Sequence, residues 1–313
     1  MIDSINEQES NPIVKLKTVR KYRSLESEHN LSGYVFILPL IIILSVFLLY
    51  SFYYLIRNSF NYITISFANP SFVGLENYKF TLTDPRFYKA LLNTFLISGA
   101  DIFMGLTFGF LVSVFLGFHF RGRKFLHSLF FIPAMLPIAF IAAVFSSMLE
   151  YREGTLNNIF RFIGADFMAQ RWLAEPGLAL FSVMSVSIYL IGIPIMYYTA
   201  DLTTINNSVL EAALIDGAGL KNMLVSILYP LMKNSHKTIV LSMLLGGFRQ
   251  MERVYLMTDG GPGGATEIIG TYIYRSTRSP GSNLGMVASA SVMILLIAFV
   301  LAFIQLKVFA NEK

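Results

Sequence analysis

The residue types that carry out covalent chemistry are sparse in this sequence and stand far apart. Its four histidines, His29, His119, His127 and His236, do not have the spacing of a shared metal site. Cysteine is absent, which excludes a thiolate nucleophile and a disulfide framework. No P-loop, HExxH or GxSxG pattern occurs either. We therefore predict that the chain is not an enzyme and has no catalytic residue, metal site or cofactor of its own.

Polar residues that could bind a solute stand instead inside long apolar segments. Asp101 interrupts one of these segments, and Arg249, Gln250, Glu252 and Arg253 stand near the end of another. Ionisable groups within a bilayer are costly, so by default they mark a transport pathway or a buried pair. Arg249 stands three residues before Glu252 and could pair with it on one helix face. Asp101 could pack against polar neighbours, contact a partner subunit or contact a solute.

Glycine and proline mark two further positions in these apolar segments. Gly192 and Pro194 interrupt one segment, and Gly246 and Gly247 precede Gln250 in another. Backbone groups that are freed at membrane depth are tolerated where they line a cavity. The sequence therefore predicts a solute site formed by these two segments. The candidate solute-binding residues are Gly192, Gly246, Gly247, Arg249, Gln250 and Glu252.

The elements that must position these residues are membrane-spanning helices. The 313-residue chain is 55% hydrophobic and 14% charged, whereas soluble domains have about 25% charged residues. A helix needs about 20 apolar residues to cross about 30 Å of hydrocarbon. Six segments meet this requirement, the fifth least clearly, and we predict an all-α, polytopic membrane protein. The predicted spans are residues 34–56, 90–118, 125–149, 177–200, 238–257 and 282–306.

Basic residues predict how these spans are oriented. The turn between the second and third spans carries Arg121, Arg123 and Lys124 without an acid, and basic residues also precede the first span. Such short basic loops stay on the cytoplasmic side of the membrane. With six spans, an N-terminal tail of residues 1–33 and a C-terminal tail of residues 310–313 are both cytoplasmic. Residues 34–309 then form one membrane domain.

The longest loop on the predicted cytoplasmic side, residues 201–237, is called the inner segment below. It contains EAALIDGAGLKNMLVSILYP, which is more polar than the spans around it. Its residues predict two short helical pieces joined by a glycine bend, which would protrude from the membrane and not cross it. The predicted features are an N-cap at Asn206–Ser208, a helix at Glu211–Ile215, a bend at Gly217 and Gly219, and a helix over Met223–Tyr229 that ends at Pro230.

The inner segment resembles the EAA signature of permease subunits of ABC importers. The run EAA is followed by DGA and then, at the family's spacing, by an apolar residue and a proline, with Tyr229 where leucine is usual. The matching residues are Glu211, Ala212, Ala213, Asp216, Gly217, Ala218, Ile227 and Pro230. The resemblance implies a type I ABC importer fold, in which the first helical piece docks on a separate ATPase and carries its motion to the spans. That ATPase, not this chain, would bind ATP and Mg²⁺.

The resemblance also implies roles for single residues of the signature. Glu211 is the best candidate for a charged contact with the ATPase. The small Ala212 and Ala213 allow the helix to enter a cleft, and Gly217 allows the bend. Asp216 could join the same contact or could cap the second helical piece.

Residues 255–271, YLMTDGGPGGATEIIGT, resemble a second signature, which occurs in carbohydrate importers of the maltose and glycerol-phosphate type. It marks the subunit similar to the larger maltose permease, here without that subunit's extra N-terminal helices and external domain. This resemblance implies sugar contacts at Gly192, Gly247 and Gln250, although Gly247 lacks the amide that is usual at its position. Arg249 or Arg253 facing the pathway would favour an anionic sugar, because guanidinium groups bind carboxylates bidentately.

The resemblance predicts an ATP-driven importer of a sugar or oligosaccharide in a bacterial cytoplasmic membrane. Its implied partners are a second similar permease, two copies of the ATPase, an extracytoplasmic binding protein and membrane lipid, with no nucleic acid. A secondary transporter driven by an ion gradient is the alternative, but it predicts internal repeats and intramembrane ion ligands. We find no repeat in the sequence. A membrane enzyme would need a nucleophile or metal cluster that the sequence does not provide.

Overall fold

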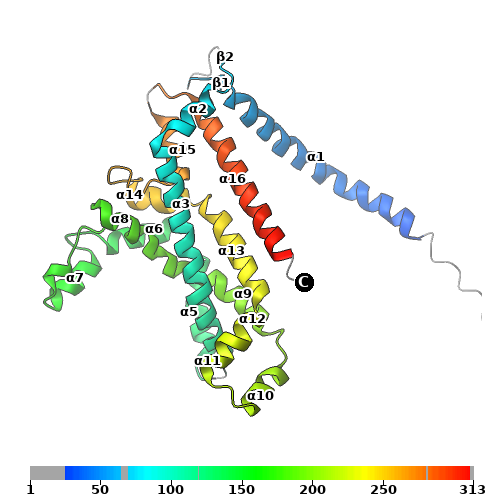
Figure 1. The fold of residues 1–313 in the computed structure, drawn as a ribbon, viewed down its shortest axis with the longest axis vertical. Coiled ribbons are helices and arrows are strands. Elements are labelled where there is room, and N and C mark those ends of the chain that lie inside the picture. Colours follow the sequence, from blue (N-terminus) through cyan, green and yellow to red (C-terminus); the bar gives the residue numbers. More distant parts are fainter. Residues whose placement is uncertain (1–24, 65–69, 119, 280, 311–313) are drawn as a thin grey trace, which may run out of the picture. The chain divides into compact units, whose positions relative to one another are not determined.

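A computed structural model describes residues 25–64, 70–118, 120–279 and 281–310, and it is almost entirely helical (Figure 1). The two strands that it describes, β1 (Asn61–Tyr62) and β2 (Ser71–Phe72), form one short antiparallel pair. The predicted all-α fold is therefore confirmed. The predicted tails, residues 1–33 and 310–313, lie largely outside the described residues. The chain divides into two compact units, Met1–Tyr54 and Leu55–Lys313.

The helices vary widely in length. Several spans contain a short 3-10 or π-helical stretch, and these stretches are labelled η. In chain order the helical elements are α1 (Leu25–Ser59), α2 (Glu76–Thr83), α3 (Pro85–Met104), η1 (Gly105–Gly109), α4 (Phe110–Gly117), α5 (Arg123–Ala134), α6 (Ile138–Met148), α7 (Thr155–Phe162), η2 (Asp166–Met168), α8 (Pro176–Ser185), η3 (Val186–Ile191), α9 (Gly192–Leu202), α10 (Asn207–Ile215), α11 (Leu220–Asn222), η4 (Met223–Leu228), α12 (Tyr229–Leu231), α13 (Lys233–Gly247), α14 (Met251–Thr258), α15 (Ile269–Arg278) and α16 (Leu284–Ala310).

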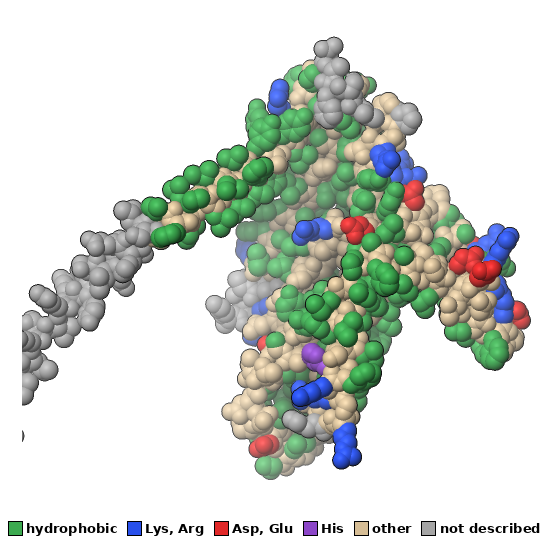
Figure 2. All heavy atoms as spheres, turned by 180° about the vertical axis from the view of Figure 1, so that it is seen from behind, with side chains coloured by type: hydrophobic (Ala, Val, Ile, Leu, Met, Phe, Trp, Pro, Cys, Tyr) green, Lys and Arg blue, Asp and Glu red, His purple; other side chains and the backbone are tan. Residues whose placement is uncertain are grey.

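Four of the six predicted spans are continuous apolar helices long enough to cross a membrane. They are Gly33–Ser59, Pro85–Gly117, Pro176–Leu202 and Leu284–Lys307. The second begins five residues earlier than predicted, because Asp84 caps it and Pro85 occupies its first position. Hydrophobic side chains cover much of the helical surface between the two ends of the molecule (Figure 2).

The predicted third span is a bent pair of helices. α5 and α6 pass the length and hydropathy test only together, and they are bent by 97°. Pro133 lies in the last turn of α5, and Pro137 directly precedes α6. Proline removes a backbone donor and disfavours helix in the residue before it, so two prolines four residues apart break the helix here.

The predicted fifth span is also two helices. α13 ends at Gly247 and α14 begins at Met251. Neither is long enough to count as a span, so the described residues contain four continuous spans, or five with the bent pair, and the predicted count of six is not confirmed. The intervening residues 248–250 and the first two residues of α14, together 248–252, are called the span-five break below.

The helix formed by α3, η1 and α4 packs against several of the other spans. Ile97 belongs to one core cluster with residues of α6, α8 and α14, and Phe110 contacts Tyr198 of α9 and His236 of α13. A Cβ atom added at Gly105 or Gly109 would lie 2.9 or 2.7 Å from Pro194. These glycines therefore provide the space in which Pro194 of α9 packs.

A polar network closes the end of the molecule that holds α2 and the start of α16. The buried Asn77 of α2 donates to the carbonyls of Ser59 and Asn61, at 2.9 Å each. Its own side-chain oxygen accepts from Asn283, at 2.7 Å. Within the unit Leu55–Lys313, the inner segment lies at the end opposite to this network (Figure 1). The fold thus places the two predicted sides of the membrane at opposite ends of one unit.

Candidate functional site

The first helical piece of the inner segment is α10, and both of its ends are capped by its own residues. Asn206 accepts a hydrogen bond from the backbone N–H two residues further on, at 3.0 Å, which confirms the predicted N-cap. At the other end the N–H groups of Gly217 and Ala218 donate to the carbonyls of Leu214 and Ala213, at 3.1 and 2.9 Å. This pair of bonds is a Schellman motif, which requires the left-handed φ of 80° that Gly217 adopts.

The exposed surface of α10 is both charged and apolar. Glu211 and Ala212 are exposed, whereas Ala213 is buried against the rest of the chain. Leu214 is also exposed, and Ile215 at the tip of the helix is 86% exposed. Exposed apolar patches next to polar residues are typical of protein interaction sites.

The second helical piece differs from the prediction. It begins at Leu220 and continues as α11, η4 and α12 through Pro230 to Leu231. It ends at Leu231, one residue beyond Pro230, so the predicted end is confirmed to within one residue. Gly219, and not Asp216, occupies the N-cap, and no side chain caps this helix. The suggestion that Asp216 caps the second piece is therefore wrong.

The second piece packs on the membrane helices. Leu228 is buried with Phe110, and the ring of Tyr229 lies 4.0 Å from the ring of His236. His236 in turn contacts the hydroxyl of Tyr198 through Nδ1, at 2.6 Å, and the carbonyl of Tyr229 through Nε2, at 2.8 Å. A movement of the inner segment would therefore press directly on α4, α9 and α13.

We expect Gly217→Ala to uncouple the two pieces of the inner segment, because a side chain at φ near 80° costs about 1–2 kcal/mol. No atom would clash with the new methyl group, so the effect comes from the backbone alone. Gly219→Ala is the matched control, because Gly219 has an ordinary φ of −69° and equally open surroundings. Energy-driven uptake by the importer that the sequence predicts should fall several-fold in proteoliposomes for Gly217→Ala and stay normal for Gly219→Ala. Equal rates in both variants would contradict the assigned role of the Schellman turn.

The glycines among the candidate solute-binding residues lie at helix crossings. A Cβ atom at Gly192 would lie 2.5 Å from the carbonyl oxygen of Phe130 on α5. A Cβ atom at Gly247 would overlap the side chain of Ser98 on α3. Gly246 is less enclosed and lies beside Gln250. Close helix packing thus accounts for Gly192 and Gly247, and their contact with a solute stays a prediction.

The span-five break holds the polar members of the predicted solute site. The side-chain oxygen of Gln250 is buried and has no hydrogen-bond partner among the described residues. Arg249 and Glu252 are exposed, and within the described part of the chain their side chains form no ion pair or hydrogen bond. The suggested pairing of Arg249 with Glu252 is therefore not found. Two exposed charges beside a broken span cannot face lipid cheaply, which leaves a partner subunit or a water-filled pathway.

Arg253 takes part in a buried ion pair that the sequence reasoning did not assemble. Its two terminal nitrogens donate to the two carboxylate oxygens of Asp101, at 3.0 Å each. Ser187 of η3 donates to the same carboxylate. The Arg253 and Asp101 side chains are 0% and 1% exposed. The pair joins α3, η3 and α14 deep in the protein, so Arg253 is not available to bind an anionic solute.

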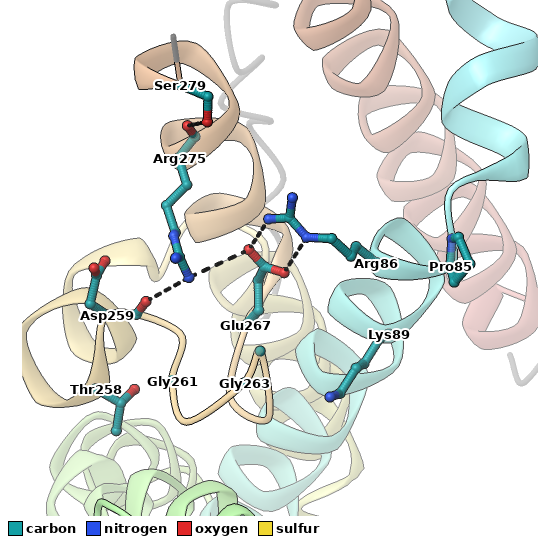
Figure 3. A pocket seen from close by; sticks show the side chains of 11 residues that line it. Pro85, Arg86, Lys89, Thr258, Asp259, Gly261, Gly263, Glu267, Arg275 and Ser279 are labelled. Atoms are coloured by element: carbon teal, nitrogen blue, oxygen red, sulfur yellow. Dashed lines mark hydrogen bonds and ion pairs between the residues drawn. The ribbon is translucent and has the colours of Figure 1, made fainter. Parts of the chain in front are cut away.

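Residues 259–268 of the second signature form a loop between α14 and α15, beside a cavity of about 600 Å³ (Figure 3). This loop is called the clamped loop below. Arg86 of α3 holds the buried carboxylate of Glu267, at 2.7 Å, and Arg275 of α15 approaches it to 3.9 Å. Asn93 donates to the carbonyls of Ala265 and Glu267, at 3.0 and 2.9 Å. The loop is thus fixed to α3 and α15. Glu267 and Arg86 therefore hold the loop in place, and the sequence analysis did not identify them. Their opposite charges are the only sequence feature that could have linked them, because their spacing follows no pattern.

Comparison with known protein families shows which family this chain belongs to. Residues 105–309 match the family described as the binding-protein-dependent transport system inner membrane component. The chain belongs to this family. The match includes the inner segment, the span-five break and the clamped loop. The chain is therefore a membrane permease of an ABC importer.

Individual relatives agree with this assignment over nearly the whole chain. The probable ABC transporter permease protein YurN of Bacillus subtilis (strain 168) is 29% identical, covering 92% of this chain and 99% of YurN. The sulfoquinovosyl glycerol transport system permease protein SmoG of Agrobacterium fabrum is 28% identical, covering 93% and 94%. A solved bacterial ABC transporter involved in the import of the acidic polysaccharide alginate has a chain with a TM-score of 0.78 at 21% identity, covering 92% and 98%. This last likeness shows the same fold.

The family assignment confirms the resemblance to carbohydrate importer permeases that the two signatures predicted. Transport, and not catalysis, is the family's activity. Arg249, Gln250 and Glu252 all lie at the span-five break, Gly246 lies beside Gln250, and Gly247 packs against Ser98 of α3, whereas Gly192 lies at a separate crossing with α5. The residues of the inner segment form a separate, protruding site.

Proposed function

We propose that this chain is one of two permease subunits of a bacterial ABC importer that carries a sugar or oligosaccharide. A separate ATPase, present in two copies, would bind ATP and Mg²⁺ and dock on α10. The observation that carries this proposal is the protruding, doubly capped helix α10 with exposed Glu211, Ala212 and Ile215. A helix that needs no partner for its own caps but exposes apolar residues at its tip is suited to enter a groove of another protein.

The two ends of the unit Leu55–Lys313 suit the two sides of the membrane. The basic turn with Arg121, Arg123 and Lys124 and the inner segment would face the cytoplasm with both termini. The clamped loop and the Asn77 network would face outward, where an extracytoplasmic binding protein would deliver the solute. Closure of the ATPase dimer on ATP would then shift the spans from an inward-open to an outward-open population.

The proposed solute site is the span-five break, with Gln250, Arg249 and Glu252. A buried amide oxygen without a protein partner and two unpaired charges can all be satisfied by a hydroxylated solute. The names of the relatives support a sugar, since SmoG is named for sulfoquinovosyl glycerol and the alginate importer for an acidic polysaccharide. Arg253 is neutralised by Asp101, so Arg249 is the remaining cation at this site for an acidic sugar.

We expect Arg249→Gln to raise the KM for solute uptake about tenfold or more, because a hydrogen bond to a charged group contributes about 1.5–3 kcal/mol. Association with the ATPase should not change. Arg121→Gln, an identical substitution in the basic turn, is the control. Kinetics of uptake into proteoliposomes gives the result, and an unchanged KM would remove Arg249 from the solute site.

The whole proposal is tested by reconstitution. The chain would be reconstituted with a second permease, an ATPase and a binding protein from the same organism, and uptake of labelled neutral and acidic oligosaccharides would be measured with and without ATP. ATP-dependent uptake that needs all components is expected. Uptake by this chain alone under an ion gradient would instead establish the secondary transporter.

A further inference from the structure

A small lobe outside the spans, residues 150–175, exposes a compact set of large apolar side chains. It follows α6 and leads into α8, and it contains α7 and η2. Ile159 and Phe162 of α7 and Ile163, its C-cap residue, lie at i, i+3 and i+4 and are all exposed. Phe167 and Met168 of η2 are exposed as well. Phe162 and Phe167 are 92% and 80% exposed, which is costly for two phenylalanines in water.

The lobe is internally fixed, so this exposure is not that of a loose loop. Asn157, which is fully buried, donates to the carbonyls of Tyr151 and Gln170, at 3.1 and 2.9 Å, and accepts from the indole of Trp172, at 2.7 Å. The ring of Phe160 lies against the indole. The inward residues of α7 are thus used by the lobe itself, whereas its second apolar face has no partner in the described chain.

Charged and apolar side chains separate on the lobe. Figure 2 shows charged side chains over the upper and outer parts of the lobe that holds α7, and hydrophobic ones at its lower end. Arg161 is held by the carbonyls of Tyr151 and Arg152, at 2.7 and 2.6 Å, away from the apolar tip. This two-sided distribution is that of a peptide segment that lies in the interface of a membrane.

The ends of the lobe hold it at the level of the membrane boundary. It begins directly after α6, the second half of the bent pair, and ends at Pro176, where a continuous span begins. One attachment is the start of a continuous span, the other is the end of the bent pair, and only 26 residues connect them, counted from 150 through 175. The lobe therefore cannot extend far from the surface of the bilayer, and its apolar tip can reach acyl chains without any change in the spans.

We propose that Ile159, Phe162, Ile163, Phe167 and Met168 form a membrane anchor that inserts into the interfacial region of the lipid bilayer. The occupant is the phospholipid surface itself, and the contact is hydrophobic, since the lobe carries three arginines and four acids and so no excess of positive charge. The anchor fixes the outer end of the bent pair α5–α6, whose second helix packs against α14 beside the span-five break. This inference depends on the membrane location of the chain and not on its substrate.

The absence of cysteine makes the proposal directly testable. A single cysteine at Phe162 or Phe167 would be labelled with the environment-sensitive dye NBD in the assembled transporter, in phosphatidylcholine nanodiscs. Asn158→Cys, on an exposed polar position of the same helix, is the matched control. The labels at 162 and 167 should show blue-shifted emission and lose most of it to lipids spin-labelled near the headgroup, and resist aqueous iodide. The label at 158 should show the reverse.

Two results would overturn the anchor. Quenching of the labels at 162 and 167 by iodide would place the apolar tip in water. Protection from both quenchers in the assembled transporter, with quenching by iodide when the second permease is left out, would show that this permease covers the tip. Co-purification of the labelled chain with its partners confirms assembly in each case.

Discussion

Replacing Asp101 with asparagine should destabilise this permease by about 3–5 kcal/mol, because the change leaves the guanidinium of Arg253 buried without a counter-charge. Asparagine has nearly the same volume, so no cavity forms, and its oxygen can still accept the hydrogen bond from Ser187. The loss therefore measures the charge alone. Arg253 is fully buried and, among the described residues, its Nε already has no partner, so it has no other acceptor to turn to.

The position of the pair makes this effect larger than that of an ordinary ion pair. Asp101 lies at the midpoint of the continuous Pro85–Gly117 span, where water cannot replace the lost contact. The carboxylate of Asp101 also accepts a hydrogen bond from Ser187, so Asp101 joins α3, η3 and α14. Thermal unfolding of the purified transporter should show a clear loss for Asp101→Asn. Asp166 is exposed and lies in the lobe of residues 150–175, so the free energy of unfolding of Asp166→Asn should stay within about 0.5 kcal/mol of that of the parent.

A double substitution separates the cost of an unpaired charge from the worth of the pair. Asp101→Leu with Arg253→Met fills the same space with apolar groups and should recover most of the stability that Asp101→Asn loses, since buried ion pairs are often replaced at little cost. If the double variant were as unstable as the single one, the pair would matter for its specific geometry and not for charge balance. Normal stability of Asp101→Asn would contradict the buried pair itself.

Local patterns in the sequence predicted those parts of the fold whose causes are local. Asn206 caps α10, and Gly217 ends it with a left-handed residue, as the composition of the inner segment indicated. Pro133 and Pro137 marked the break in the third span but could not give its 97° angle, because that angle depends on what α6 packs against. Pro230 marked the end of the second piece to within one residue, but the sequence did not indicate that this piece begins at Leu220 or contains the π-helical stretch η4.

Contacts between distant residues could not be predicted from spacing. Asp101 and Arg253 are 152 residues apart, and Arg86 and Glu267 are 181 apart. The sequence showed only that charged residues such as Asp101 and Arg253 stand in apolar segments. This identifies residues that need a partner but does not say which residues pair. The proposed solute site is harder still, because Arg249 and Glu252 are exposed and have no partner in the described chain. If the proposed second permease completes this surface, the sequence of one chain cannot define the site.

Glu211→Lys is the second substitution from which we expect a large effect, in this case on assembly with the ATPase. Glu211 is exposed, and within the described chain its side chain has no partner, so folding should not depend on it. Reversing a charge that is buried in an interface typically costs about 2–5 kcal/mol, or about thirtyfold and more in affinity. Binding of the ATPase to the permease pair in nanodiscs should weaken by at least that factor, with no change in thermal unfolding.

The comparison with neutral and remote substitutions makes this result specific. Glu211→Gln removes the charge without reversing it and should weaken binding less than Glu211→Lys, while Glu153→Lys in the side lobe should leave binding intact. Normal affinity together with lost ATP-driven uptake would move Glu211 from docking to the transmission of motion, because α10 would still bind but no longer press Leu228 and Tyr229 against the spans. Normal affinity and normal uptake would mean that the apolar tip at Leu214 and Ile215, and not the acid, is the part of α10 that the ATPase recognises.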